Sequence, residues 1–403
     1  MRYSLKNLPP CHPRPEAPKT ARWLLVLAAM VAISMTLLRI LSKYTEYSFS
    51  WGVAAGILAV FWTTIYLGRL SVWLFQHSWA NAYDRKREAW ILQQTRKARR
   101  ALQILNFTFV TAHEQKRQAD VLQEIISGRQ ILKAQQDREG NVGYRLSRLR
   151  PDSELLTTEE EIHLLFSRIV DELPLDRFPQ SQSLVIAFDI SSSLDVQIIK
   201  NIWFKVWREK GRPNPVEYQA GEGLNLIERW LNQNIQSESL LLMVALQISP
   251  VPVNQTTEAA VGLLLGNRLT QHLLTPKALL HRPDASASGE LEAGINMAAY
   301  NVPVAEGIDG NLWLGNLSDK QYTEVIMNQN KRPLHSVPED RLIHIDSLIG
   351  NAGAAAPWLS LACAAQTAHA AQKSQMVICG ERGRDVLWST VITPGTFRQE
   401  TDS

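Results

Sequence analysis

The residues best suited to chemistry lie near the C-terminal end of the chain, in the segment LIGNAGAAAPWLSLACAAQTA from Leu348 to Ala368. A Gly-Asn-Ala-Gly turn runs directly into a row of small residues and then into an apolar helix. Enzymes use such turn-to-helix junctions to hold a catalytic side chain over a buried pocket. Asn351 is the polar side chain of this turn, and its amide can donate a hydrogen bond to an enolate oxygen or cap the helix. The segment is therefore either an active site or a packing junction.

Three other kinds of segment carry reactive side chains, and each has a structural alternative. DISSSLD puts serines after a predicted strand but lacks the G-x-S-x-G pattern, so Ser191 or Ser192 is expected to cap the next helix. GERGRD, residues 380–385, is basic enough to meet a phosphate, although we interpret it as a hairpin turn between the closing strands. HRPD and LHSVPED place histidines beside acids in proline-containing loops, which is weak support for a dyad. The sequence contains no Walker loop.

The three cysteines, Cys11, Cys363 and Cys379, form no CxxC motif and no Cys/His cluster with metal-ligand spacing. We therefore predict no metal site and no other cofactor. The odd number and the apolar surroundings of two of them favour reduced thiols in the cytoplasm over a disulfide framework. Cys363 is expected to be a buried, unreactive thiol in the middle of a helix. We interpret Cys11 as an ordinary thiol in a proline-rich leader, not as a lipidation site or a metal ligand.

Two apolar stretches near the N-terminus predict a transmembrane hairpin over residues 21–79. The first is WLLVLAAMVAISMTLL, residues 23–38, and the second is WGVAAGILAVFWTTIYLG, which begins at Trp51 and ends before Arg69. About 20 apolar residues span the hydrocarbon core, a length that the first stretch reaches if Arg22 and Arg39 extend to the two interfaces. A cleaved signal peptide is the alternative for the first stretch, but a second span follows directly and no clean cleavage site is present.

The basic residues that flank the hairpin predict its orientation. They precede the first stretch and follow the second, in DRKREAW and TRKARR, whereas the connecting loop RILSKYTEYSFS has few charges. By the positive-inside rule both termini are cytoplasmic, which places the protein in a bacterial inner membrane. The overall formal charge is only +3, so we attribute the basic half of the chain to membrane topology and predict no nucleic-acid partner.

The segments on either side of the hairpin lack the pattern of a globular core. Residues 1–20 are rich in proline and predict a disordered leader. Apolar residues recur at helical spacing in WILQQTRKARRALQILNFTFV and ADVLQEIISGRQILKAQ, which predicts one long helix from Ala80 to about Asp137. This helix would form most of a juxtamembrane linker over residues 80–150, whose TRKARR cluster is either a site for anionic lipid headgroups or a solvated helix face.

From residue 155 to 403 the pattern becomes that of an α/β layered domain. SLVIAFDI at 183–190 and SLLLMVALQI at 239–248 are continuous apolar runs typical of buried strands, and DVQIIKNIWFKVW and GLNLIERWLNQ predict helices between them. Further strands and helices alternate up to the closing strands QMVICGE and VLWSTVITP. Apolar strands that alternate with helices favour a mainly buried sheet covered by helices.

The order of these elements resembles the thiolase fold of β-ketoacyl synthases and related condensing enzymes. The segments that carry the resemblance are GEGLNLIERWLNQ, SLLLMVALQI, TEAAVGLLLG and GNAGAAAPWLSLACA, and it extends over residues 183–394. It implies a thiolase-like domain, which the orientation of the hairpin makes cytoplasmic. Because the soluble part is short for a fold of two duplicated halves, the first half is expected to be truncated. The resemblance also implies a homodimer, since thiolase-like proteins usually pair through their central sheet.

The resemblance implies a site in which the catalytic residues are incomplete. Condensing enzymes need a cysteine at the start of a buried helix, where this chain has Gly221 or Glu222. Asn351 occupies the second catalytic position, and the remaining histidine is expected upstream, as His335 or His344. A carboxylate cannot replace a thiolate in acyl transfer, so we interpret GNAGAAA as the packing junction of a former active site.

The sequence therefore predicts a degenerate condensing-enzyme-like domain, anchored in the lipid bilayer, that acts as an adaptor or scaffold for a protein partner. An envelope or secretion assembly is the context that this architecture suggests. The alternative is a membrane-bound acyl-thioester enzyme of fatty-acid or lipid metabolism, with catalytic residues Glu222, Asn351 and His344. In that case the three side chains are expected to meet in one pocket.

Overall fold

The structure is a computed structural model, and it describes residues 8–41, 51–113, 117–149, 156–212, 214–270, 272–302, 304 and 306–395. The chain divides into two compact units, Met1–Lys97 and Ala98–Ser403. The predicted connecting loop of the hairpin lies mostly outside the described residues.

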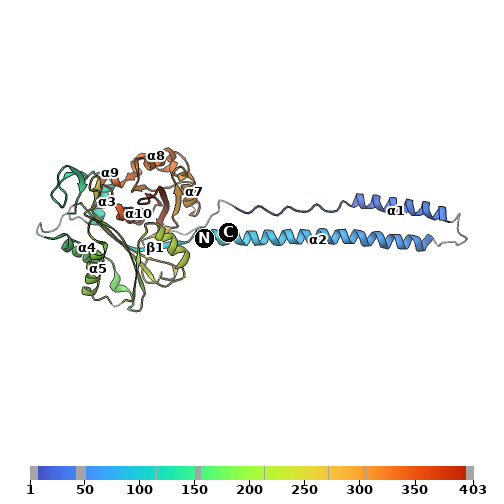
Figure 1. Cartoon of the computed structure of the whole chain (residues 1–403), viewed down its shortest axis with the longest axis horizontal. Helices are drawn as coiled ribbons and strands as arrows, with labels where there is room; N and C mark the ends of the chain where they lie inside the picture. Colours follow the sequence, from blue (N-terminus) through green and yellow to red (C-terminus); the bar gives the residue numbers. More distant parts are fainter. Residues whose placement is uncertain are drawn as a thin grey trace. The chain divides into compact units, whose positions relative to one another are not determined.

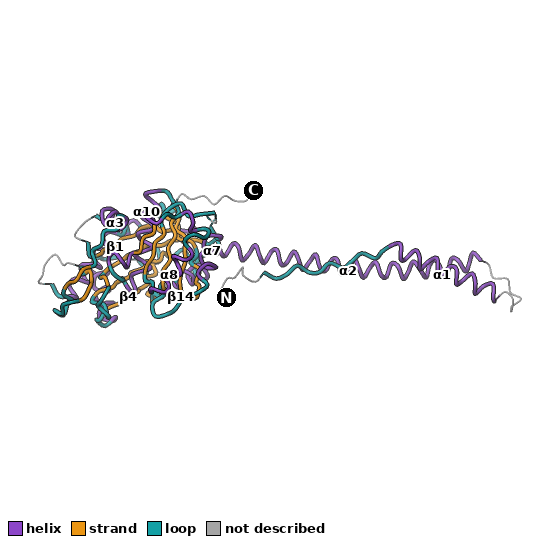
Figure 2. The backbone as a smooth tube through the Cα atoms, turned by 90° about the horizontal axis from the view of Figure 1, so that it is seen from above, coloured by secondary structure: helices purple, strands orange, loops and turns teal. Residues whose placement is uncertain are grey.

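The first unit consists of α1 (Thr20–Leu41) and α2 (Trp51–Ala98), which run side by side (Figures 1 and 2). The indole Nε1 of Trp62 donates to the carbonyl of Trp23 at 3.1 Å, and the rings of Trp23 and Tyr66 lie 5.6 Å apart. The apolar windows of the two helices have mean hydropathies of 2.2 and 1.6, and neither window is buried at all. At 1.5 Å per residue even α1 is about 33 Å long. Both helices are thus long and apolar enough to cross a membrane.

Residues 8–19 form an extended segment along α2, where the sequence predicts a disordered leader. The backbone N–H of His12 donates to the carboxylate of Asp84 at 3.1 Å. The indole of Trp73 donates to the carbonyl of Pro15 at 3.2 Å, and the guanidinium of Arg87 donates to that of Pro9 at 2.5 Å. A proline-rich chain has free carbonyls because it makes no regular internal hydrogen bonds, and here α2 supplies the donors.

The predicted long helix from Ala80 is correct only as far as Ala98. It is followed by β1 (Ala101–Thr111), α3 (Gln118–Ile126), β2 (Lys133–Gln135) and β3 (Tyr144–Ser147). The apolar residues of β1 face two different hydrophobic clusters, because Leu102 and Ile104 belong to one and Leu105 to the other. Burial on both faces, together with two phenylalanines and two threonines that favour strands, overrides the helical spacing.

The second unit is built from two halves with the same order of elements. The first half contains β1, α4 (Thr158–Glu172), β4 (Leu184–Ser192), α5 (Val196–Glu209), β5 (Val216–Ala220), α6 (Asn225–Gln233), β6 (Leu240–Ile248) and β8 (Ala259–Gly266). The second half contains β9 (Ala278–His281), α7 (Leu291–Tyr300), β11 (Leu312–Gly315), α8 (Asp319–Asn328), β12 (Leu342–His344), α10 (Ala356–Ala371), β13 (Gln375–Gly380) and β14 (Val386–Pro394).

The strand orders of the two halves correspond one to one. They are β5-β4-β6-β8-β1 and β12-β11-β13-β14-β9, and in each the first three strands are parallel and the last two are antiparallel to their neighbours. β1 pairs antiparallel with β9 and joins the halves into one sheet, to which β10 (Asp284–Ala287) adds along β14. The prediction of a truncated first half is therefore wrong, because β1 and α4 complete it.

The side chains of each strand alternate between its two faces, so the core consists of three separate hydrophobic clusters. On β6, Leu241 and Met243 point to the central cluster, whereas Leu240 and Leu242 point to the outer cluster under α4 and α5. A third cluster lies between the second half-sheet and the outer helices α7 and α8. The central layer holds α6 and α10, and Figure 1 shows α10 between the α4–α5 and the α7–α8 sides. The predicted α/β layered domain is confirmed, as five layers in the order α-β-α-β-α.

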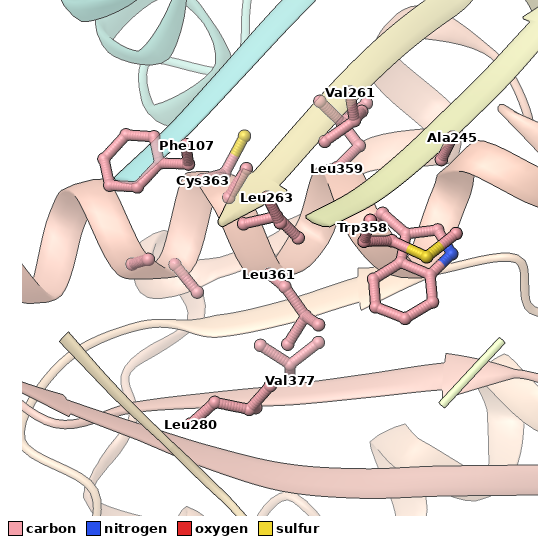
Figure 3. Packing of buried hydrophobic residues seen from close by; sticks show 14 of the residues in the cluster. Phe107, Ala245, Val261, Leu263, Leu280, Trp358, Leu359, Leu361, Cys363 and Val377 are labelled. Atoms are coloured by element: carbon pink, nitrogen blue, oxygen red, sulfur yellow. The ribbon is translucent and has the colours of Figure 1, made fainter. Parts of the chain in front are cut away.

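Helix α10 is buried on all sides from Ala356 to Ala365, as expected of a helix that is apolar all round. Leu359 and Cys363 point toward β8 and β1, whereas Leu361 points toward Val377 of β13 and Leu280 of β9 (Figure 3). Alanine fills most of its other positions, so both half-sheets can approach the helix closely.

We expect the substitution Leu361→Ala to lower the free energy of unfolding by about 3 kcal/mol, because it leaves a cavity between α10 and the second half-sheet. Urea unfolding of the full-length protein in a mild detergent, followed by tryptophan fluorescence, measures this loss. Lys320→Ala, on the exposed face of α8, is the control and should change the free energy by less than about 0.5 kcal/mol. An equal effect of the two substitutions would contradict this packing of α10.

Candidate functional site

A cavity of about 240 Å³ opens at the starts of the two central helices. Strands contribute Asp189, Cys379, Gly380 and Trp388, the start of α6 contributes Glu222 to Asn225, and the start of α10 contributes Gly353, Ala354 and Pro357. Asn316 follows β11, and Glu381, Arg382 and Arg384 come from the hairpin between β13 and β14. The interpretation of GERGRD as a hairpin turn is confirmed, and the hairpin also forms one wall of this cavity.

The turn before α6 packs against the end of β4 without room for a side chain. The N–H of Gly221 donates to the carbonyl of Phe188 at 2.5 Å, and a Cβ added at Gly221 would lie 2.5 Å from the same oxygen. Gly223 has a φ of +56°, which favours glycine. The two glycines therefore let the chain turn tightly between β5 and the helix, and they leave Glu222 as the side chain of the turn.

Asp189 lies at the wall of the cavity and joins the two central helices. Its Oδ2 accepts a hydrogen bond from the indole Nε1 of Trp358 on α10, at 2.9 Å, and one from the N–H of Gly223, at 3.0 Å. Burial raises the pKa of the Asp189 carboxyl above its ordinary value, although these two hydrogen bonds oppose the change. Sequence reasoning missed this residue, because its partner Trp358 is 169 positions away.

Glu222 reaches the cavity, but its carboxylate is already engaged. Asn225 donates to it at 2.8 Å and the guanidinium of Arg229 lies 3.1 Å away. The hydrogen bond from Asn225, together with Arg229, holds the pKa of this carboxyl below its ordinary value. Its side chain is 47% exposed, so the group is an ionised, hydrated carboxylate at the rim.

Asn351 lies beside the cavity and is hydrogen-bonded on both sides of its amide. Its Nδ2 donates to Oδ1 of Asn316 at 3.0 Å, and its Oδ1 accepts from the N–H of Gly353 at 2.7 Å. Asn316 in turn donates to the carbonyl of Gly380 at 2.8 Å. Asn351 and Asn316 also line an adjoining cavity next to the hairpin. The predicted capping of the helix by Asn351 is therefore not observed: the N-cap of α10 is Ala355, without a side-chain cap, and the bond to Gly353 closes the turn before the short 3-10 helix Gly353–Ala355.

The structure does not bring the two predicted histidines to this cavity. His344 stacks on Tyr322, with ring centroids 4.7 Å apart, and its Nε2 lies 3.8 Å from Asp346. His335 is exposed in the short turn Leu334–Ser336. The side chain that meets Asn351 from an upstream segment is Asn316, which no pattern in the sequence singled out. Glu222 and Asn316 share the cavity, Asn351 adjoins it, and His344 and His335 lie elsewhere.

The thiols of this unit are buried. Cys379 is 1% exposed, and burial raises its pKa to about 12. Cys363 is fully buried in α10, as predicted, and burial raises its pKa to about 12 as well. In the part of the chain that the structure describes, no three His, Cys, Asp or Glu side chains are grouped as a metal site.

We expect Asp189→Asn to remove a pH-dependent part of the stability. Because the pKa of Asp189 is raised by folding from 3.8, its contribution is present below that pH and is lost as the pH rises through the folded-state value. The asparagine side chain keeps an acceptor for Trp358. The difference in unfolding free energy, wild type minus variant, should therefore fall with rising pH in a series of urea titrations. A difference that is constant with pH would contradict a buried, ionisable Asp189.

Comparison with known proteins agrees with this architecture. No family model matches the sequence, and no curated protein matches it significantly, whereas many solved structures match the fold. "The ishigamide ketosynthase/chain length factor" is 14% identical with a TM-score of 0.53, over 73% of this chain and 99% of that chain. "PfaC Keto synthase-Chain length factor" is 9% identical with a TM-score of 0.52, over 75% of this chain and 44% of that chain. Such low identities show the fold alone: the α/β unit is thiolase-like and has the architecture of condensing enzymes.

Proposed function

We propose that the chain is a bacterial inner-membrane protein whose thiolase-like unit has lost condensing chemistry and serves as an adaptor or scaffold for a protein partner. An envelope or secretion assembly is the context that we favour. The alternative is a membrane-bound acyl-thioester enzyme of fatty-acid or lipid metabolism.

The observation that carries this proposal is the turn Gly221–Gly223 at the start of α6. Acyl transfer from a thioester needs a thiolate there, and this chain offers only the carboxylate of Glu222, which Asn225 and Arg229 already engage. The one thiol at the cavity wall is Cys379. Burial raises the pKa of this thiol to about 12, so it is protonated at neutral pH.

The polar groups around the cavity support a structural role. Asp189 joins the start of α6 to α10, and Asn351 joins the start of α10 to Asn316 and hence to β13. Each amide or carboxylate that condensing chemistry would direct at a substrate is hydrogen-bonded within the protein. Loss of catalysis is therefore compatible with retention of these residues, because they hold the central layer together.

The hydrogen bonds of the leader support the orientation of the hairpin. Residues 8–19 contact α2 between Trp73 and Arg87, which follows the charge-free stretch of that helix. These contacts support a hairpin in which the leader and the C-terminal end of α2 lie on the same side of the bilayer. The basic residues of both segments favour the cytoplasm. The lipid bilayer is thus one partner of the protein in this proposal.

A second copy of the chain is a further partner that we propose. β5 is an edge strand of the sheet, and Tyr218 on it is 40% exposed. Exposed edges present backbone groups that can pair with another strand. Pairing of two β5 edges would give the homodimer that the resemblance implies.

Alkylation tests the loss of the nucleophile. We expect native full-length protein at pH 7.5 to take up one iodoacetamide group per chain, at the exposed Cys11, because the other two thiols are buried and protonated. Cys11→Ser should take up none while folded and two after unfolding. Intact-mass spectrometry counts the groups. Rapid modification of Cys379 in the folded protein would instead indicate an activated thiolate and favour the enzyme.

Affinity purification tests the adaptor role. The full-length protein in mild non-ionic detergent should retain a stoichiometric protein partner that a chain ending at Lys97 loses, with mass spectrometry as the readout. Glu222→Gln is the matched variant: it removes the carboxylate that the enzyme would need and should leave the partner bound. Recovery of acyl carrier protein or a bound acyl thioester, lost in Glu222→Gln, would establish the alternative.

A further inference from the structure

A second cavity, of about 220 Å³, lies between the end of β1, α3 and the small sheet of β2 and β3. It shares no lining residue with the cavity at the starts of the central helices. The residues that matter for its chemistry are His113, Glu124, Arg129, Lys133, Ser147 and Arg148. The proposed function makes no use of this cavity.

The lining of this second cavity carries more positive than negative charge. Arg129, Lys133 and Arg148 are cationic, and Glu124 is the one carboxylate among the lining residues. Arg129 already pairs with this carboxylate, at 2.5 Å between Nη1 and Oε1, and the Nε2 of His113 lies 3.7 Å from its Oε2. Lys133 therefore leaves a positive charge that an anion would balance, whereas Arg148 also interacts electrostatically with Glu161, which lies outside this cavity.

Two donors at this cavity are buried and have no hydrogen-bond partner among the described residues. They are the hydroxyl of Ser147, whose residue is 1% exposed, and the Nε of Arg148. The Nη1 of Arg148 donates to the carbonyls of Gln136 and Asp137 at 3.3 and 3.1 Å, which fixes the guanidinium in place. Buried donors without an acceptor are costly, and native proteins satisfy nearly all of them. The unused donors thus point to a ligand that supplies acceptors.

We propose that this cavity binds a phosphate group. A phosphate offers several acceptor oxygens in a tetrahedral arrangement, enough for Ser147, Arg148 and Lys133 together, whereas a carboxylate has only two oxygens. Arginine and lysine are the residues that bind phosphate best, and a fixed guanidinium loses little entropy on binding. The phosphate belongs to a soluble phosphate compound or to a lipid headgroup, and the same residues would bind either.

The test is isothermal titration calorimetry of the full-length protein in non-ionic detergent, at constant ionic strength with chloride as the reference salt. The probes are inorganic phosphate, sn-glycerol 3-phosphate and a short-chain phosphatidic acid. Lys133→Gln, at an exposed residue, should weaken binding about fivefold. The double variant Arg129→Gln/Lys133→Gln should abolish binding, because the negative charge of Glu124 is then no longer neutralised by Arg129 and repels an anion. Lys320→Gln on α8 is the matched control and should bind like wild type. Unchanged thermal unfolding without phosphate verifies that the variants fold.

The outcomes separate the sources of the phosphate. Saturable binding of the two water-soluble probes that Lys133→Gln weakens supports the site and a soluble ligand. Binding confined to the short-chain lipid, and weakened in the same way, supports the site and a lipid headgroup. Absence of saturable binding for all three probes, or equal binding by wild type and the Arg129→Gln/Lys133→Gln variant, would overturn the proposal.

Discussion

The burial of α10 between two half-sheets is the constraint on which the rest of the α/β unit depends. A helix enclosed on all sides needs small residues where the sheets approach and apolar residues where they do not, which the sequence APWLSLACAAQTAHAA supplies. The duplicated strand orders follow from this arrangement, because each half must cover one side of the same central layer. The hydrogen bond from Trp358 to Asp189 is a polar contact at the edge of this apolar layer, and it joins α10 to β4.

The candidate site is a consequence of that central layer. The starts of α6 and α10 lie beside the same cavity, and the backbone N–H groups there need acceptors. Asp189 accepts from Gly223, and Asn351 accepts from Gly353 and is itself bound to Asn316. In a condensing enzyme the same place would hold a nucleophile and its hydrogen-bond donors. In our proposal the turn Gly221–Gly223 stands in the place of that nucleophile, and Asp189, Asn316 and Asn351 are hydrogen-bonded within the protein. A cavity with polar walls can therefore persist at the starts of α6 and α10 even where, as we propose, no condensation takes place.

Much of the fold could be predicted from the sequence, because buried strands such as LLLMVALQI are continuous apolar runs and the Gly-Asn-Ala-Gly turn marks the start of the central helix. The strand β1 could not be predicted. Its apolar residues follow α2 after a short basic segment, and their spacing fits a helix as well as a strand. Only contact with α10 on one face, and with the outer cluster on the other, shows it to be a strand. The missed strand also made the first half look truncated.

The site was less predictable than the fold. The resemblance to condensing enzymes pointed to Glu222 and Asn351, which precede the two central helices, and their catalytic role stays a prediction. Asp189 and Asn316 were not predicted as site residues, because the side chains to which they are hydrogen-bonded lie 169 and 35 positions away in the sequence. Neither predicted histidine lines the cavity, because His344 stacks on Tyr322 and His335 is exposed in a turn.

The most direct test of the central claim is whether the protein forms an acyl-enzyme. The purified full-length chain would be incubated with acyl thioesters of several chain lengths, and its intact mass measured before and after. Our account predicts no acyl adduct in the unit that begins at Ala98. One acyl group per chain, mapped by peptide mass spectrometry to the residues around the start of α6 or to Cys379, would contradict it.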